Sequence, residues 1–320
     1  MCLKKFLVFC VSFFVAVSNV FGVCSSAEGG NKNLETNQME NITSRNWMKN
    51  LSDSALVTDL NIPGTHDSGT GRVTVFTEGY AKCQSKSITE QLNCGIRYLD
   101  LRINEKGLIN HGGVSCWKSL FKKLYIQDIE NYITDFLKSN SSETVILQIK
   151  SEGGGNCANI VNKTLVNSSL YYKNNKNIEN LTLKDVRGKF VIFSRQSGIR
   201  DAYNYYSWDD NVSFDEIWLD SNLGYLQDKY NSSISNKKES IDDFYEKIWK
   251  EDEGIPKLIV NFTSFTTAPI TLNFLYPSVN DYMSKYVDDN NDKKFGIILM
   301  DNPKDSLIEK IYNTNYNRVF

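Results

Sequence analysis

The spacing of short apolar runs along the chain is the feature that most limits its fold. Candidate strands are residues 59–62, 97–102, 144–150, 189–194, 257–261 and 295–300. Several are nearly continuous in β-branched or aromatic residues, which is typical of strands buried on both faces of a parallel sheet. Helical patterns separate these runs, and the alternation predicts a parallel α/β architecture. At 320 residues the chain has the size of a single β/α barrel.

Helix signals are clear at three places between the candidate strands. The segment from Ser87 to Glu90 has the form of a capping box, and Gly95 follows it as a stop signal. Two later segments carry apolar stripes at helical spacing. The stripes are Ile126, Ile129, Ile133, Phe136 and Leu137, and Ile241, Phe244, Ile248 and Trp249.

The N-terminal residues have the pattern of a secretory signal. Lys4 and Lys5 precede an apolar run over residues 6–17 that is too short to span a bilayer. We assign residues 1–27 to a signal peptide, 28–45 to a polar leader and 46–320 to one barrel domain. The sequence therefore predicts an exported, extracellular protein.

Charge and cysteine spacing exclude several classes of function. Loss of residues 1–27 removes two lysines and no acids, so the formal charge changes from −2 to −4. No basic run resembles a nucleic-acid footprint, and we expect no nucleic-acid partner. The remaining cysteines have no C-x-x-C spacing, which disfavours metal or thiol-redox chemistry. The sequence leaves two alternatives for Cys83, Cys94, Cys116 and Cys157. They are free thiols, or they form up to two disulfides in any of three pairings.

The chain contains only two histidines, His66 and His111, and both stand in glycine-punctuated segments. Imidazole is the only side chain whose unperturbed pKa lies near neutral pH. If the protein transfers protons near pH 7, these two residues are the default candidates. Losing either one should then abolish activity.

Polar residues follow or close several candidate strands. They are His66, Arg102, Lys150, Arg195 and Asp301. In a β/α barrel the carboxyl ends of the strands surround one mouth, so residues far apart in the sequence converge there. The sequence therefore predicts a polar site at this end of the barrel.

Two imidazoles, an arginine and carboxylates at one mouth suit the cleavage of a phosphodiester without a metal. A neutral histidine can take a proton from the attacking hydroxyl, and a protonated one can give a proton to the leaving oxygen. Arginine can neutralise charge on the phosphorus oxygens. Each histidine needs an orienting partner, and Asp67 and Asp301 are the available carboxylates.

Short segments in a fixed order carry a resemblance to a known family. They cover residues 62–70, 95–102, 111–112, 142–150, 188–195, 227–230, 261–264 and 298–301. In this order they resemble the catalytic X-region of bacterial phosphatidylinositol-specific phospholipase C. The likeness extends over almost everything from Trp47 onward.

The resemblance implies a single distorted, incompletely closed TIM-type β/α barrel and a metal-independent phosphodiesterase. Such an enzyme cleaves phosphatidylinositol to diacylglycerol and inositol 1,2-cyclic phosphate. His66 resembles the general base that deprotonates the inositol 2-hydroxyl, with Asp301 as its partner. His111 resembles the acid that protonates the leaving diacylglycerol, and Asp67 helps to hold it. Arg102 resembles the cation that contacts the nonbridging oxygen.

The headgroup-binding positions of the family also have counterparts, at Lys150, Arg195, Asp228 and Tyr230. Charged donors and a carboxylate can hydrogen-bond vicinal hydroxyls, and an aromatic face can cover the ring. A fixed guanidinium at Arg102 would occupy and repel the metal site of calcium-dependent relatives. We therefore expect no metal and no other cofactor.

Three neighbouring features have a more local interpretation. Asp100 alternates with Leu99 and Leu101 on the strand that carries Arg102, so it either supports that arginine or contacts substrate directly. Trp117 and the aromatic cluster at residues 203–208 are assigned to packing.

The implied substrate lies in a membrane, so we expect peripheral contact with lipid by a monomeric protein. Anchors made of glycosylphosphatidylinositol remain open as a second substrate class. The apolar segment 268–277, and Val75, Phe76 and Tyr80, are candidates for this contact, with packing against the barrel as an equal alternative. Without a basic run, docking should depend little on anionic lipid.

Two other functions compete with this interpretation. A metal-dependent glycerophosphodiesterase on a similar barrel would need a His-Arg pair near the first strand and a Glu-x-Asp metal motif, and neither is in place. A lipid-binding barrel without turnover would need no matched acid and base. The paired histidines favour the enzyme.

Overall fold

The computed structural model describes residues 42–320 except 206–207, 221, 252–256 and 268–271. The predicted signal peptide, most of the leader and part of the lipid-contact candidate 268–277 lie outside the described residues. No described helix combines the length and apolar character that crossing a bilayer requires.

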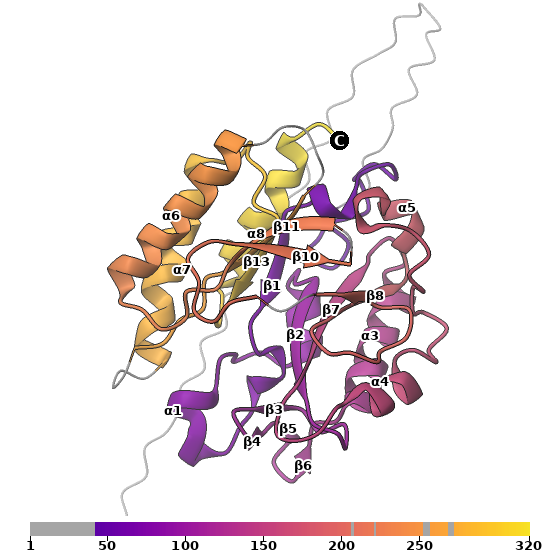
Figure 1. Ribbon diagram of the computed structural model, residues 1–320. Helices are drawn as coiled ribbons and strands as arrows, with labels where there is room; N and C mark the ends of the chain where they lie inside the picture. Colours follow the sequence, from indigo (N-terminus) through magenta and orange to yellow (C-terminus); the bar gives the residue numbers. More distant parts are fainter. Residues whose placement is uncertain (1–41, 206–207, 221, 252–256, 268–271) are drawn as a thin grey trace, which may run out of the picture. The chain divides into compact units, whose positions relative to one another are not determined.

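A nine-stranded sheet forms the centre of the molecule (Figure 1). Its order is β10-β11-β12-β13-β1-β2-β7-β8-β9, and neighbours run parallel except for the antiparallel pair β10–β11. The strands are β1 (Ile62–Thr65), β2 (Tyr98–Ile103), β7 (Val145–Ser151), β8 (Phe190–Ser194), β9 (Tyr203–Asn204), β10 (Asp215–Leu219), β11 (Asn222–Gln227), β12 (Leu258–Phe262) and β13 (Ile297–Met300).

The sheet curls into a barrel that is closed except at one seam, as the resemblance implies. The seam lies between β9 and β10, where an isolated bridge between Tyr205 and Leu219 replaces a continuous ladder in the described part of the chain. Opposite ends of the sequence meet elsewhere in the barrel. Strand β1 pairs with β13, and the register runs from Ile62 opposite Ile297 to Thr65 opposite Met300.

Helices cover the outside of the strands. In Figure 1, α6 and α7 lie on one side of the barrel and α3, α4 and α5 on the other. The predicted stripe from Ile126 to Leu137 is buried on α3. The helices are α1 (Glu78–Ala81), α2 (Ile88–Asn93), α3 (Ile126–Ser139), α4 (Ala158–Thr164), α5 (Leu183–Val186), α6 (Ile234–Glu251), α7 (Leu272–Asp289) and α8 (Asp305–Asn313).

Helix α2 begins with the predicted capping box. The Ser87 side chain accepts from the Glu90 amide, and the Glu90 carboxylate accepts from the Ser87 amide. The helix ends at Asn93, and Gly95 has a φ of 111°, a left-handed conformation that favours glycine. The predicted stop signal is therefore confirmed.

The first strand lies later than its predicted position at 59–62. Residues Val57–Asp59 form a 3-10 turn, and β1 begins at Ile62 and includes Pro63 and Gly64. These two residue types are depleted in strands, so the pattern placed the end of the strand before them. Here Gly64 permits a close approach of β2, because a Cβ at this position would lie 3.0 Å from the Tyr98 Cβ.

Strands β10 and β11 were not predicted. Polar residues and Gly224 interrupt the apolar pattern of β11, which therefore lacks a strand signal of its own. The glycine is required by packing, because a Cβ at Gly224 would lie 2.7 Å from the Leu258 carbonyl oxygen on β12.

The end of the predicted leader is held by a buried arginine. The Arg97 guanidinium donates to the carbonyls of Ser44 and Arg45, at 3.1 and 2.8 Å. It also pairs with the buried Glu143 carboxylate at 2.9 Å. The last leader residues are thus attached to the barrel at the N-terminal end of β2.

Candidate active site

The residues predicted for the site line one cavity. Its volume is about 410 Å³, and it opens where the parallel strands end. The predicted residues on its wall are His66, Asp67, Arg102, His111, Lys150, Arg195, Asp228, Tyr230 and Asp301. Segments from all around the barrel therefore converge at the carboxyl ends of the strands.

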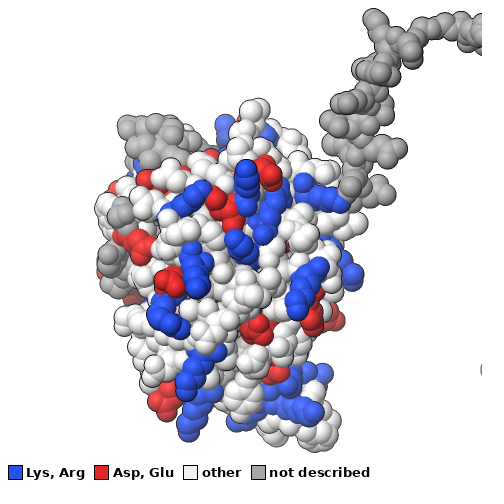
Figure 2. All heavy atoms as spheres, turned by 90° about the vertical axis from the view of Figure 1, so that its right-hand side faces the viewer, with Lys and Arg blue, Asp and Glu red and all other residues white. Residues whose placement is uncertain are grey.

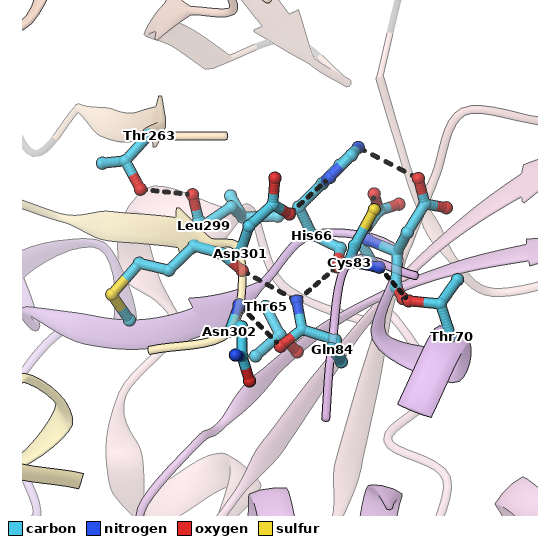
Figure 3. Close-up of polar contacts among 12 residues, drawn as sticks. Thr65, His66, Thr70, Cys83, Gln84, Thr263, Leu299, Asp301 and Asn302 are labelled. Carbon is cyan, nitrogen blue, oxygen red and sulfur yellow. Dashed lines mark hydrogen bonds and ion pairs between the residues drawn. The ribbon is translucent and has the colours of Figure 1, made fainter. Parts of the chain in front are cut away.

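His66 directly follows β1, and Asp301 directly follows the paired strand β13. The His66 amide donates to the Met300 carbonyl, which continues the pairing of the two strands by one residue. Parallel pairing thus brings the side chains together, and His66 Nδ1 lies 2.9 Å from Asp301 Oδ1. Gln84 supports both segments by donating to the carbonyls of His66 and Met300 (Figure 3).

Asp67 lies between the two histidines. Its φ of 42° is left-handed, a conformation that aspartate tolerates better than most residues. One carboxylate oxygen, Oδ2, lies 3.0 Å from His66 Nε2 and 3.3 Å from His111 Nε2. The ring centroids of the two histidines are 6.2 Å apart. Two imidazoles can therefore face one small group in the cavity.

His111 is carried by a hairpin of β3 (Asn110–His111) and β4 (Val114–Ser115). Gly112 and Gly113 form its turn with φ values of 54° and 81°, as a two-residue hairpin turn of this kind requires. His111 Nδ1 lies 2.9 Å from the Ala81 carbonyl oxygen, which can only accept. Nδ1 is therefore the protonated nitrogen, and Nε2 faces the cavity.

Arg102 is fixed by Asp100, which resolves the open role of that residue as support. Alternation along β2 places both side chains on one face of the strand. The guanidinium donates three hydrogen bonds of 2.9 to 3.1 Å to the buried Asp100 carboxylate. Although burial opposes ionisation, the pairing with Arg102 holds the pKa of Asp100 below its usual value. Arg102 Nε also lies 3.6 Å from Asp67 Oδ1.

The other wall of the cavity holds the predicted headgroup residues and one that the sequence analysis missed. The Arg195 guanidinium lies 3.6 Å over the ring of Trp208, and Trp208 Nε1 donates to Asp228 at 3.3 Å. Trp208 packs against Tyr205 and Phe262, as its assignment to packing predicts, but it also lines the cavity and contacts both charged residues. Tyr230 donates to Asp210 at 2.8 Å.

His66 has an unusual protonation equilibrium. Burial lowers the pKa of its imidazole, but the charges of Asp67 and Asp301, together with the hydrogen bond to Asp301, outweigh burial and raise the pKa to about 9. The resting imidazole is therefore protonated at neutral pH. Any role as a base requires that this proton first be lost.

Two further residues of the cavity were not predicted as site residues. Glu152 accepts from the Gly112 amide at 3.1 Å and so helps to hold the hairpin that carries His111. Cys83 also lines the cavity. All four described cysteines are free thiols, which answers the pairing left open by the sequence. No local pattern marks Cys83, because its neighbours in space come from distant segments.

Comparison with known proteins agrees with this arrangement. Residues 60–196 match the family model described as phosphatidylinositol-specific phospholipase C, X domain. Two 1-phosphatidylinositol phosphodiesterases are each 27% identical to the chain. The Staphylococcus aureus protein aligns over 80% of this chain and 87% of its own length. The Listeria monocytogenes protein aligns over 97% of this chain and 96% of its own length.

A solved structure supports the fold. It belongs to a study of membrane binding by the S. aureus phosphatidylinositol-specific phospholipase C, and it superposes with a TM-score of 0.73 at 24% identity. The superposition covers 85% of this chain and 97% of that one. Together with the matched X domain, these findings confirm the resemblance seen in the sequence: the chain is similar to bacterial phosphatidylinositol-specific phospholipases C over most of its length, and residues 60–196 match their X domain.

Proposed function

We propose that this protein cleaves phosphatidylinositol by metal-independent acid–base catalysis between His66 and His111. The observation that carries the proposal is the arrangement of the two rings, 6.2 Å apart, with Asp67 between them and Arg102 beside it. A phosphodiester in the cavity would have a base on one side, an acid on the other and a guanidinium at its oxygens. The relatives named above carry the same activity in their names.

In the first stage neutral His66 takes the proton of the inositol 2-hydroxyl through Nε2, while Nδ1 donates to Asp301. The hydroxyl oxygen attacks phosphorus, and the bond to diacylglycerol breaks as His111 Nε2 gives its proton to the leaving oxygen. The product is inositol 1,2-cyclic phosphate. In a second stage, His111 deprotonates a water molecule that opens this ring and His66 acts as the acid.

The headgroup is held on the opposite wall. Lys150 and the Arg195 guanidinium offer donors to the inositol hydroxyls, and Asp228 offers an acceptor. Tyr230 offers an aromatic face for the ring. The contact between Arg195 and Trp208 fixes the direction of the donors before substrate arrives. This pre-organisation favours a neutral polyol ring next to the phosphate.

Phosphorus NMR tests the proposal directly. Vesicles of phosphatidylinositol incubated with the enzyme and a chelator should give the signal of a cyclic phosphodiester. Unchanged lipid beside intact vesicle binding would instead support a lipid-binding barrel without turnover. Activity that disappears with the chelator and returns with added calcium would support a metal-dependent enzyme.

The acid side of the pH profile should depend on Asp301. Because His66 must be neutral to act as a base, kcat/KM on a water-soluble inositol phosphodiester should rise with pH toward the His66 pKa of about 9. Asp301→Asn removes one of the carboxylates that raise this pKa. The acid limb should therefore move to lower pH in the variant, even though kcat falls.

Proton NMR provides an independent measurement of the same pKa, since the protein has only two imidazoles. The His66 ring protons should titrate at lower pH in Asp301→Asn than in the unmodified protein. Asp305→Asn, a change in an exposed carboxylate just beyond the site, is the matched control. Equal titration in all three proteins would contradict the role given to Asp301.

Peripheral contact with lipid has a structural basis at the cavity mouth. Val75 and Phe76 are 75% and 91% exposed, and Tyr80 lines the cavity itself. A second hairpin, β5 (Trp117–Ser119) and β6 (Lys122–Lys123), carries Leu120 and Phe121 at its tip, both largely exposed. The Trp117 amide donates to the Arg72 carbonyl, so the two segments are neighbours. Both lie at the same end of the barrel (Figure 1).

The second hairpin changes the expected lipid preference. Its apolar tip lies among Lys118, Lys122 and Lys123, and basic side chains gather at this end of the face drawn in Figure 2. Elsewhere on that face acidic and basic residues are mixed. The sequence analysis considered only runs of basic residues and so expected little dependence on anionic lipid. Lys118 is paired with Asp128, so Lys122 and Lys123 supply the net positive charge beside the tip, and we infer that anionic lipid strengthens docking.

Removing the exposed aromatic residues should weaken vesicle binding. Burial of a phenylalanine side chain contributes roughly 1.5–3 kcal/mol, so Phe76→Ser or Phe121→Ser should each reduce partitioning about tenfold or more. Vesicle sedimentation measures this change, and hydrolysis of a soluble substrate should remain normal. Val319→Ser, which changes an exposed residue near the C-terminus, is the control. Full vesicle binding by the variant with both Phe76→Ser and Phe121→Ser would show that these segments do not contact the lipid.

Export, monomeric state and cleavage of glycosylphosphatidylinositol anchors complete the proposal. The N-terminal pattern at residues 1–27 supports export. The cavity is formed by one chain and contains a complete set of acid, base and cation, so a second copy is not needed for catalysis. Anchors share the inositol phosphodiester with the free lipid. Release of an anchored protein from cell membranes tests this substrate class.

A further inference from the structure

Cys83 lines the catalytic cavity, and the mechanism does not use it. It is buried beside the two histidines, and its amide donates to Thr70 Oγ1 at 3.0 Å. Figure 3 shows its side chain next to His66. The sulfur lies 3.8 Å from His111 Nδ1. A thiol at this position adds a soft ligand to a site that otherwise holds nitrogen and oxygen atoms.

The sulfur belongs to a cluster of potential metal ligands. Asp67, Cys83 and His111 each offer one donor atom, and the three atoms lie within 4.8 Å of one another. Cys83 forms a second such group with His66 and Asp301. Thiolate, imidazole and carboxylate together are the ligand types of zinc sites. Calcium and magnesium prefer oxygen ligands alone, so the sulfur selects against them.

The surroundings of His111 and Asp67 also suit a bound cation. A metal-binding histidine usually donates its other ring N–H to a carbonyl or carboxylate, and His111 Nδ1 does so to Ala81. This leaves Nε2 directed toward Asp67 Oδ2, 3.3 Å away. Asp67 is only 2% exposed, and apart from ion pairs with His66 at 3.0 Å, His111 at 3.3 Å and Arg102 at 3.6 Å its carboxylate oxygens have no hydrogen-bond partner. A cation bound between Asp67 Oδ2 and His111 Nε2 would contact both atoms.

The charge of Arg102 does not exclude such an ion. Its guanidinium is directed into three hydrogen bonds with Asp100, so this pair is nearly neutral. The carboxylates of Asp67 and Asp301 together outweigh the single positive charge of the His66 imidazolium between them, so the centre of the site keeps a net negative charge. A dication that also takes up a thiolate would neutralise this charge.

We propose that Zn²⁺ binds to Asp67, Cys83 and His111 and reversibly inhibits the enzyme. A water molecule from the cavity supplies the fourth ligand. On binding, the Cys83 thiol releases its proton to solvent, and the metal takes the lone pairs of Cys83 Sγ and His111 Nε2; an imidazolium form of His111 would release its Nε2 proton as well. The ion is not a cofactor: it removes the acid of the reaction and occupies the space of the phosphate.

Zinc titration of the chelator-treated enzyme tests the proposal. Zinc should inhibit hydrolysis, and excess chelator should restore it fully. Equilibrium dialysis should find one tightly held zinc ion per chain. Cys83→Ser should keep its basal activity and require about tenfold or more zinc for the same inhibition. Cys157→Ser, a change in another buried thiol outside the cavity, should behave like the unmodified enzyme.

Cobalt gives a readout that does not require activity. Co²⁺ bound to a thiolate absorbs in the near ultraviolet, and this band should be present in the unmodified protein and in Cys157→Ser but absent in Cys83→Ser. His111→Ala should lose tight zinc binding by dialysis whether or not it retains turnover. Cys83→Ala serves the same purpose if the serine variant does not fold. Equal inhibition of Cys83→Ser and the unmodified enzyme, or one bound zinc ion with full activity, would overturn the proposal.

Discussion

Replacing His111 with alanine should lower kcat on phosphatidylinositol by about 10²- to 10⁴-fold, the usual contribution of a positioned acid or base. Diacylglycerol is a poor leaving group, and without His111 its oxygen departs unprotonated. A nitrophenyl ester of inositol phosphate needs no proton on its leaving oxygen. The same variant should therefore lose much less activity on that substrate, as steady-state rates on the two substrates will show.

His66→Ala provides the comparison, because a base acts before the leaving group departs. Its loss should be similar on both substrates. The Nε2 atoms of the two rings face the same Asp67 oxygen, so the roles cannot be assigned from distance to that residue alone. Hydrogen bonding separates them, since His66 pairs with a carboxylate and His111 with a carbonyl. Greater leaving-group sensitivity in His66→Ala than in His111→Ala would reverse the assignment.

Loss of the Arg102 guanidinium should have an effect of similar size. A donor directed at charge that develops in the transition state contributes about 10²- to 10³-fold to kcat. The kcat of Arg102→Met should therefore be lower than that of the unmodified enzyme by at least this factor. Arg102→Lys should recover only part of the rate, because an ammonium lacks the planar fork of donors. A substrate with sulfur in place of a nonbridging phosphate oxygen should reduce the rate of the unmodified enzyme by a larger factor than it reduces the rate of Arg102→Met.

Stability must be measured beside activity in this series. Arg102→Met leaves the Asp100 carboxylate buried without its partner, which costs roughly 3–5 kcal/mol when one member of such a pair is removed. Asp100→Asn in the Arg102→Met background should restore much of the free energy of unfolding and none of the lost kcat. A rate that returns together with stability would show that Arg102 is structural only.

The sequence was sufficient to predict which residues line one cavity, because strand order determines where they lie. His66 and Asp301 are separated by most of the chain, yet each directly follows a strand, and parallel pairing of β1 with β13 brings them together. The same argument places Arg102 and Lys150 in register on β2 and β7. A hydrophobic pattern is enough to find such positions.

Contacts made by loops could not be predicted in this way. Cys83 and Trp208 reach the cavity through segments without a regular period, and only the path of the backbone brings them beside His111 and Arg195. The position of Asp67 between two rings depends on one left-handed backbone conformation, which the sequence permits without specifying. Strand β11 was not predicted because Gly224 interrupts its apolar pattern. This glycine allows β12 to pack closely against β11, a contact that the local sequence does not indicate.

The pairing of β1 with β13 sets the order in which the protein becomes functional during synthesis. The partner of the first barrel strand lies far along the chain, so a nascent chain that ends before residue 297 has neither a closed wall nor an aspartate beside His66. Contacts of such long sequence separation form late in folding. Catalytic competence therefore arises only after Asp301 has been synthesised and β13 has paired with β1.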